Sequence, residues 1–406
     1  MTIDRNRRRF LRATAALPIA RAVGCVTFGA ASVAFAGTPA TDRAFDSAFD
    51  RYRHLLVLVE LKGGNDGLNT LVPYTDAAYY ALRPKLAIAR DQIIQLSDRV
   101  GLHPALAPFS AFWRDRELAV LQGVGYPQPN LSHFRSIEIW DTASRSDEYR
   151  EDGWLTRTFA QQPVTASYAA DGVVIGSNDL GPLSGSGART IALADTPTFL
   201  RRARLAQPAA AAPNKALAHI LKVEADIVQA RGHLATERAF EIEVPASGFG
   251  NAVKTACQVI ANPSGVAAVR LTLTGFDTHT HQPGTQARLL AELAGGLTAL
   301  KSALVELGRW NETLVLTYAE FGRRPRENLS LGTDHGTSNV HFALGGRVAG
   351  GLYGETPDLT LLSSDGNPRH ALDFRDVYAT VLERWWDVDA RNALGGRFTA
   401  VPFLRM

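Results

Sequence analysis

Carboxylate and imidazole side chains stand next to each other in the second half of this chain. Residues 332–337 place Asp334 and His335 between two glycines. Oxygen and nitrogen donors of this kind bind divalent cations in proteins. The glycines allow a tight turn and the close approach of a ligand. An Asp-His-Gly triplet also occurs in ordinary turns, so its interpretation as a metal site depends on the residues around it.

A second group of such side chains follows an apolar run. Residues 265–274 are β-branched and apolar, which predicts a strand, and Asp277, His279 and His281 come directly after it. Alternate positions of an extended chain share one side, so all three can face one ligand. We expect them to bind a metal, although a lone histidine of this kind is more often structural.

Glu320 and Arg323 follow the next predicted strand, residues 311–319. The Glu320 carboxylate occupies a position suited to a metal ligand, and the planar guanidinium of Arg323 is suited to an anionic oxygen. The alternative is an ordinary Glu–Arg surface pair. Because Asp334 and His335 come only after a further excursion, either Glu320 replaces them as ligand or the excursion folds back and delivers both.

Two further candidates lie in the first half of the chain. Asp66 belongs to a glycine-rich loop after the predicted strand 54–60, and it is a candidate ligand or simply part of an Asp-Gly turn. Ser132 precedes a helix predicted to start at His133. It is a candidate nucleophile activated by a metal, or it is only a helix N-cap.

These residues require a scaffold that brings distant strand ends together. Apolar runs separated by helical patterns predict an α/β fold with a mostly parallel sheet, whose chemistry lies at the carboxyl ends of the strands. The predicted strands are residues 54–60, 118–122, 172–175, 265–274, 311–319 and 341–346, and the predicted helices are 77–83, 104–114, 133–140, 215–235, 250–260, 286–309 and 374–386. Residues 147–215 are interpreted as an inserted region of a single domain, 37–406.

The N-terminal residues 1–36 are typical of a twin-arginine signal peptide. Residues 7–12 read Arg-Arg-Arg-Phe-Leu-Arg, an apolar stretch follows, and residues 34–36 form a small-residue cleavage site. We therefore expect the twin-arginine translocase as a partner and a periplasmic or secreted location. Lipid attachment at Cys25 is disfavoured because Ala22 replaces the larger apolar residue of a lipoprotein signal.

The charge balance excludes one class of partner. The whole chain has 43 basic and 40 acidic residues, but residues 1–36 hold six arginines and one aspartate. The remainder is slightly acidic, so nothing indicates nucleic-acid binding. The sequence after residue 36 also has no uncharged apolar stretch long enough to cross a membrane.

The motifs together resemble an exported bacterial family of unknown function, DUF1501, which is placed with the alkaline phosphatase and sulfatase superfamily. The stretches that carry the resemblance are residues 63–67, 132–134, 275–279, 320–323 and 332–336. The resemblance implies a three-layer sandwich with a central, mostly parallel sheet between helices. It also implies one or two divalent metals at Asp66, at Asp277 with His279 or His281, and at Asp334–His335, with Ser132 as the nucleophile.

The leading hypothesis is an exported metal-dependent hydrolase of phosphate or sulfate esters, acting on an anionic substrate. The residue types do not distinguish zinc, manganese, iron, calcium and magnesium. The alternative is a non-catalytic metal-binding protein of the cell envelope. A third hypothesis, a metal-independent serine hydrolase of carboxyl esters, lacks the Gly-x-Ser-x-Gly elbow that it would need.

Overall fold

The computed structural model describes residues 50–193 and 238–405. The predicted leader with Cys25, the predicted helix 215–235 and the last part of the predicted insertion lie outside the described residues. Within the described ranges, no helix has both the length and the apolar character needed to cross a membrane.

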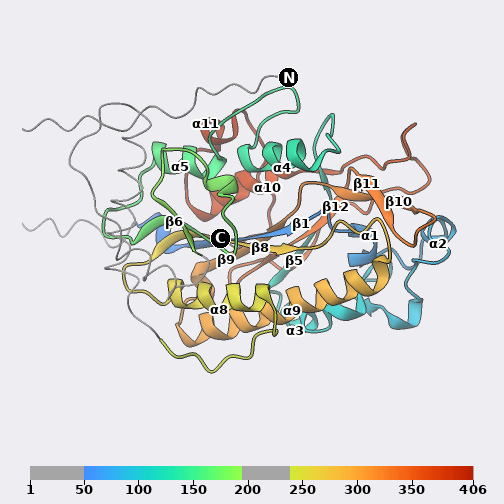
Figure 1. Cartoon of the computed structure of the whole chain (residues 1–406), viewed down its shortest axis with the longest axis horizontal. Helices are drawn as coiled ribbons and strands as arrows, with labels where there is room; N and C mark the ends of the chain where they lie inside the picture. The colour runs from blue at the N-terminus through green and yellow to red at the C-terminus, as the bar shows by residue number, and fades with distance from the viewer. Residues whose placement is uncertain (1–49, 194–237, 406) are drawn as a thin grey trace, which may run out of the picture. The chain divides into compact units, whose positions relative to one another are not determined.

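One nine-stranded sheet organises the described chain (Figure 1). Its strand order is β13–β5–β12–β9–β1–β8–β6–β7, and β14 also pairs with β5. All its pairs are parallel except those of β12, which runs antiparallel to β5 and β9. The strands are β1 (Leu55–Lys62), β5 (Leu118–Gly125), β6 (Ala170–Ile175), β7 (Thr190–Leu193), β8 (Val266–Thr274), β9 (Thr313–Tyr318), β12 (Asn339–Leu344), β13 (Gly351–Gly354) and β14 (Leu372–Asp373).

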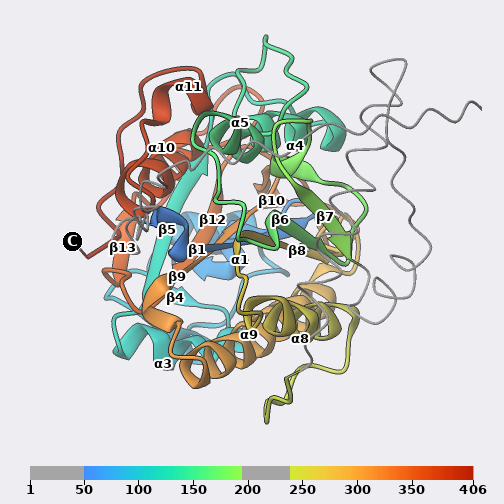
Figure 2. The ribbon, with the colours of Figure 1, turned by 90° about the vertical axis from the view of Figure 1, so that its left-hand side faces the viewer.

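Helices cover both faces of this sheet, which confirms the predicted three-layer α/β fold (Figures 1 and 2). On one face lie α3 (Phe109–Arg114), α8 (Gly248–Ile260) and α9 (Gln282–Glu306). On the other lie α4 (His133–Thr142), α5 (Trp154–Gln161), α10 (Phe374–Ala379) and α11 (Ala390–Leu394). The short helices α1 (Gly67–Thr70) and α2 (Ala77–Leu82) follow β1.

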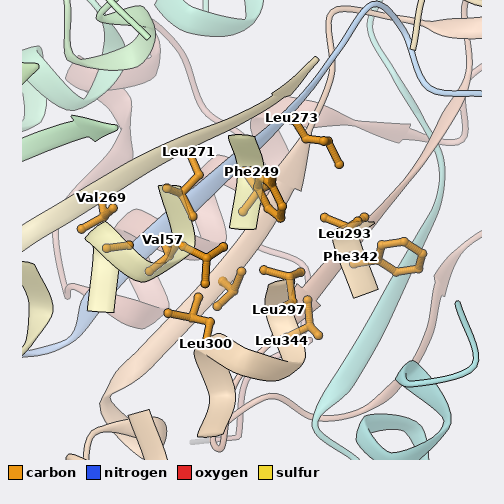
Figure 3. Packing of buried hydrophobic residues seen from close by; sticks show 14 of the residues in the cluster. Val57, Phe249, Val269, Leu271, Leu273, Leu293, Leu297, Leu300, Phe342 and Leu344 are labelled. Carbon is orange, nitrogen blue, oxygen red and sulfur yellow. The ribbon is translucent and has the colours of Figure 1, made fainter. Parts of the chain in front are cut away.

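The pleat of the central strands explains the two-sided burial. In β1, Val57 belongs to the core beneath α8 and α9, whereas Leu56 and Leu58 belong to the core on the α4 side. Figure 3 shows the first of these cores, where sheet residues pack against Phe249 of α8 and Leu297 of α9. Because both faces are buried, the strands read as continuous apolar runs.

Two small antiparallel sheets lie outside the main sheet. One consists of β2 (Leu71–Val72), β3 (Ile94–Gln95) and β4 (Gly101–Leu102). The other is a hairpin of β10 (Gly322–Glu327) and β11 (Thr333–Gly336), in which Arg323 pairs with His335. The excursion after Glu320 therefore folds back on itself.

The predicted elements within the described residues have counterparts in the structure, with ends shifted by a few residues, and three of them differ further. β5 continues to Gly125, so part of the predicted loop 123–130 is strand, and Gly123 adopts the left-handed φ of 63° that accommodates it. The predicted helix 104–114 is divided into a 3₁₀ turn, Pro104–Leu106, and α3. The predicted closing helix changes after α10 into a π-helix, Thr380–Trp385.

Candidate metal centre

The candidate site lies where the central strands end. β1, β8 and β9 are parallel neighbours, so the residues that follow them share one edge of the sheet. This edge receives Asp277 from the loop after β8 and Glu320 from the loop after β9. His133 is the first residue of α4, and the β10–β11 hairpin carries Asp334 and His335 to the same edge.

Three side chains form the centre of the site: His133, Asp277 and His335. One potential ligand atom from each lies within 4.8 Å of the other two. His133 Nε2 lies 3.5 Å from Asp277 Oδ2, and His335 Nε2 lies 3.3 Å from Asp277 Oδ1. A nitrogen and an oxygen bound to one tetrahedral zinc ion would be about 3.3 Å apart, given metal–ligand bonds of about 2.05 Å. The spacing therefore fits a single coordinated cation.

Hydrogen bonds on the far side of each ring fix the histidine tautomers. His335 Nδ1 lies 2.8 Å from the carbonyl oxygen of Leu131, which can only accept, so Nδ1 carries the proton. His133 Nδ1 lies 2.8 Å from Oε1 of Glu320, a carboxylate oxygen that accepts, so this Nδ1 also carries the proton. In the neutral rings both Nε2 atoms then carry a lone pair, and both face Asp277. This is the outer support that metal-ligating histidines usually have.

The charge states suit this arrangement. Burial would raise the pKa of Asp277, but the hydrogen bond and charge of Arg323 hold that pKa below its usual value. Burial lowers the pKa of His335, which favours its neutral, ligating form. The hydrogen bond to Glu320 raises the pKa of His133, so a proton competes with a cation at this ring.

Glu320 is buried beneath His133 and has unused bonding capacity. Its Oε1 atom accepts from His133 and from the backbone N–H of Gly63, at 2.8 and 2.9 Å. Its Oε2 atom is buried and has no hydrogen-bond partner among the described residues. An orphaned buried carboxylate oxygen beside three ligand atoms is a second indication that a cation belongs here.

His279 extends the centre toward the surface. Its Nε2 atom lies 2.9 Å from His335 Nε2 and 3.1 Å from Asp277 Oδ1. Its Nδ1 atom lies 3.3 Å from Asp334 Oδ1. Two imidazole nitrogens at this separation require a proton or a cation between them. His279 thus lies against the cluster, its ligand role stays a prediction, and Asp334 contacts the cluster through it.

Arg323 lies behind Asp277, where its side chain is buried. The guanidinium donates to Asp277 Oδ1 at 2.7 Å. It also donates to four backbone carbonyls, those of Gly63, Gly64, Phe276 and Thr333. These bonds join the ends of β1 and β8 to the hairpin. A substrate oxygen could bind this guanidinium only by displacing such partners, so the geometry favours a positioning role.

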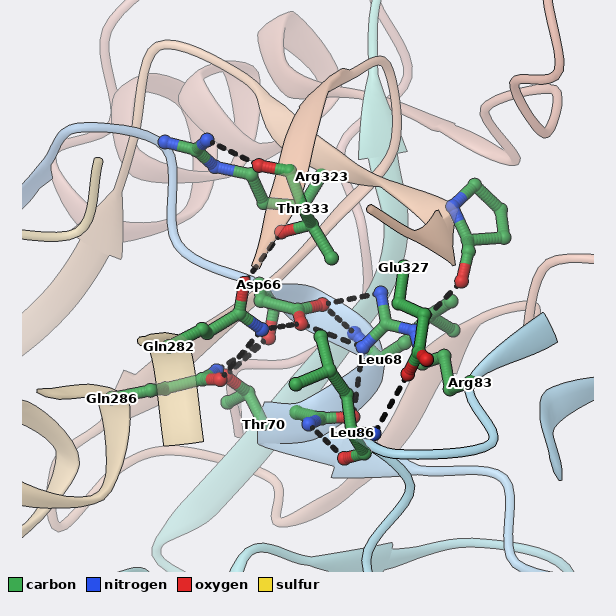
Figure 4. Close-up of polar contacts among 12 residues, drawn as sticks. Asp66, Leu68, Thr70, Arg83, Leu86, Gln282, Gln286, Arg323, Glu327 and Thr333 are labelled. Atoms are coloured by element: carbon green, nitrogen blue, oxygen red, sulfur yellow. Dashed lines mark hydrogen bonds and ion pairs between the residues drawn. The ribbon is translucent and has the colours of Figure 1, made fainter. Parts of the chain in front are cut away.

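Asp66 is held in a separate buried network (Figure 4). Its two carboxylate oxygens accept from Arg83 at 2.6 and 3.0 Å. They also accept from Gln282 Nε2 and from the backbone N–H of Leu68. Protein donors thus occupy the oxygens that a metal would need, and the structure does not bring Asp66 into the cluster.

Ser132 and His281 stand at helix starts beside the cluster. Ser132 is the exposed N-cap of α4, immediately before His133, and the described residues show no hydrogen bond from its hydroxyl. His281 is the exposed N-cap of α9, with a left-handed φ of 49°. Its backbone N–H donates to Ser330 O at 3.2 Å, and His281 does not belong to the group of potential ligands formed by His133, Asp277 and His335. The catalytic role of Ser132 and the ligand role of His281 stay predictions.

His133 is the site residue that the sequence interpretation missed. In the sequence, the start of this helix draws attention to Ser132 as its N-cap and not to His133. The available signal was a third histidine at the same sheet edge, in the first turn of a helix that follows β5.

Solved structures with a related arrangement include several hydrolases. A phosphonate monoester hydrolase of Agrobacterium radiobacter is 12% identical, with 84% of this chain and 77% of that chain covered and a TM-score of 0.37. A protein in the alkaline phosphatase superfamily from Vibrio parahaemolyticus is 12% identical, with 85% and 69% covered and a TM-score of 0.39. The PsFucS1 sulfatase from Pseudoalteromonas sp. is 10% identical, with 86% and 70% covered and a TM-score of 0.40.

No curated protein matches the sequence. The family model described as "Protein of unknown function (DUF1501)" matches residues 113–394, which include every residue of the cluster. With more than half of the sequence matched, the chain belongs to the DUF1501 family.

Proposed function

We propose that this chain is a metal-dependent hydrolase of phosphate or sulfate esters. The observation that supports the proposal most strongly is the donor set of His133, Asp277 and His335. Its atoms have the spacing of ligands around one cation, and both imidazoles present their lone pairs to the carboxylate. The set stands at the sheet edge where α/β proteins place their chemistry.

His133, Asp277, His335 and His279 would hold the cation, with Glu320 supporting from below. When bound, a divalent cation lowers the pKa of a coordinated hydroxyl or water and polarises an ester oxygen. The closed network around Asp66 leaves one such position rather than two. We therefore propose one cation per chain.

The residues of the chain have distinct roles in this proposal. Glu320 accepts the Nδ1 proton of His133 and thereby orients the ring. Arg323 holds the Asp277 carboxylate and keeps it ionised. Ser132 would attack the ester as nucleophile, since its hydroxyl is exposed beside His133. The free N–H groups in the first turn of α4 favour an anionic group at the same place.

One observation favours the alternative of a non-catalytic, metal-stabilised binding protein of the cell envelope. Arg323 and Asp66, two residues expected to act on substrate or metal, are both engaged by protein partners. The two functions differ in the consequence of Ser132→Ala. That substitution abolishes turnover by a hydrolase, whereas it leaves the affinity of a binding protein for its ligand unchanged.

The test is elemental analysis and an ester assay on protein purified from the periplasm. We further propose that the twin-arginine translocase exports the protein. Absence of the protein from the periplasmic fraction would contradict this export. We expect about one equivalent of a divalent transition metal, together with hydrolysis of 4-nitrophenyl phosphate or sulfate. Asp277→Ala should remove both, whereas the exposed control Asp91→Ala should retain both. Turnover that survives Asp277→Ala would exclude the proposed site.

A further inference from the structure

Lys62 ends the central strand directly beside the candidate metal centre. It is the exposed last residue of β1, whose preceding residues are all buried. Its backbone pairs with Thr274 of β8, and its carbonyl accepts from the N–H groups of Gly275 and Phe276. The residue is therefore fixed at the root of the loop that carries Asp277.

The end of β1 lies close to Glu320. Glu60 of β1 is opposite Tyr318, the last residue of β9, and the backbone N–H of Gly63, the residue after Lys62, donates to Glu320 Oε1 at 2.9 Å. Neighbouring strands are about 4.8 Å apart, and alternate residues share one face. Lys62 accordingly faces the same side as Leu58 and Glu60 of β1, and Leu58 belongs to the core on the α4 side.

The effect of Lys62 on Glu60 agrees with this orientation. Burial raises the pKa of the Glu60 carboxyl, and the charges of Arg270 and Lys62 oppose that rise. This effect agrees with the side of the sheet that the alternation along β1 gives to Lys62. Lys62 itself is exposed, and the described residues include no ion-pair partner for it. Its charge is directed to solvent beside the centre.

The charges of the centre call for such a group. Three carboxylates, those of Asp277, Glu320 and Asp334, carry three formal negative charges, and Arg323 offsets one of them. A divalent cation offsets the other two, so the loaded centre is close to neutral. A dianionic phosphate ester would then be attracted by the metal and by the N–H groups of α4, but not by an excess of positive charge in the centre. A further cation beside the metal would strengthen anion binding.

Two other cations near the strand ends, Arg323 and Arg270, are already engaged. Arg323 is bound to Asp277 and to backbone carbonyls. Arg270 is buried between Glu60 and the Tyr318 hydroxyl, at 2.7 and 2.8 Å. Lys62 differs because its three donors are exposed at the end of a long, adaptable side chain.

We propose that the Lys62 ammonium binds an oxygen of the substrate's anionic phosphate or sulfate group and holds that group against the metal centre. This assignment rests on the proposed function and adds the group that supplies positive charge to the anion. The binding is electrostatic and involves no covalent step. It predicts that Lys62 matters for anion affinity and has no part in holding the metal.

The test measures inorganic phosphate binding to the metal-loaded protein by calorimetry, together with the metal content. Lys62→Gln should weaken phosphate binding by about tenfold to a hundredfold, the value of a lost charge-assisted hydrogen bond. Lys62→Arg should restore most of it. The matched control is Lys254→Gln, an exposed lysine of α8 on the opposite face of the sheet, and it should bind like the wild type.

The outcomes separate this inference from the proposed function. If the Lys62→Gln variant binds phosphate as well as the wild type does, the role of Lys62 is overturned and the hydrolase proposal stands. Loss of metal in Lys62→Gln would also overturn it, because the residue would then support the cation instead of the anion. Metal-loaded wild-type protein that binds neither phosphate nor sulfate would overturn both proposals.

Discussion

The pair of Asp66 and Arg83 offers the sharpest test of the structure against the sequence interpretation. Asp66 is 1% exposed, and the Arg83 side chain is fully buried against it. Asp66→Asn removes the charge but leaves the guanidinium with a neutral acceptor on Asn69, at 2.7 Å. Removing one partner of a buried ion pair lowers the free energy of unfolding by about 3–5 kcal/mol. We expect the lower value for Asp66→Asn, because Arg83 keeps its other acceptors.

Arg83→Met should cost more. The Asp66 carboxylate then keeps only Gln282 and the Leu68 N–H as donors, and the carbonyls of Arg324 and Pro325 lose a partner. We expect about 4–5 kcal/mol for this variant. The double variant should be more stable than the sum of the two effects predicts, by about 2 kcal/mol or more, because neither charge is left alone.

Urea unfolding of the four proteins gives the stabilities, and elemental analysis gives the metal content. The structure predicts that Asp66→Asn is destabilised and keeps its metal, because donors other than a cation satisfy this carboxylate. If Asp66 is a ligand, the same variant loses its metal as Asp277→Ala does. Loss of metal without loss of stability would refute the structural reasoning.

Two further predictions concern buried histidines and a strained glycine. Burial lowers the pKa of His103 to about 4 and that of His341 to about 3, so between pH 6.5 and these values only the unfolded chain binds the proton. Stability should thus fall on acidification below pH 6.5 by about 1.4 kcal/mol per pH unit for each group, and His341→Gln should remove one such share from the pH dependence of urea unfolding. Gly63 has a φ of 116°, and an added Cβ would lie 2.3 Å from the backbone nitrogen of Asp277. Gly63→Ala should therefore cost about 1–3 kcal/mol and weaken metal binding, and an unchanged metal affinity would contradict the close packing of these loops.

The central strands could be predicted because burial on both faces leaves a direct trace in the sequence. The runs that became β1, β8 and β9 are predominantly apolar, although Glu60 and Arg270 are buried among them, and each ends at a polar loop. Strand order could not be predicted in the same way, because it depends on contacts between residues far apart in the chain. The antiparallel direction of β12 likewise has no local signal.

The site was predictable to the extent that its residues follow strands. Asp277 and Glu320 come directly after β8 and β9, and the structure brings them together. His133 was missed because its position depends on the phase of α4 against the sheet edge. The place of Asp66 was equally hidden. Its partner Arg83 lies on a separate segment beyond α2, and only the tertiary structure brings this donor to the carboxylate.

The β10–β11 hairpin settles the question left by the excursion after Glu320. It delivers both Asp334 and His335 while Glu320 remains in place beneath His133. Sequence spacing alone could not decide this, because a turn of suitable length is compatible with either arrangement. Gly332 is informative in retrospect: a Cβ there would lie 2.2 Å from the backbone of His279.

If the proposed cation binds, the same hairpin couples its binding to local unfolding. His335 sits on a two-stranded element outside the central sheet, and contacts such as the bond from Asn328 to the His279 carbonyl hold it in place. A cation shared by His335, His133 and Asp277 would tether this element to a helix and to a strand end. At a concentration one hundred times its dissociation constant, such a ligand opposes opening by about 2.7 kcal/mol. Conversely, any change that loosens the hairpin must weaken cation affinity by the same free energy, even when it leaves every ligand atom intact.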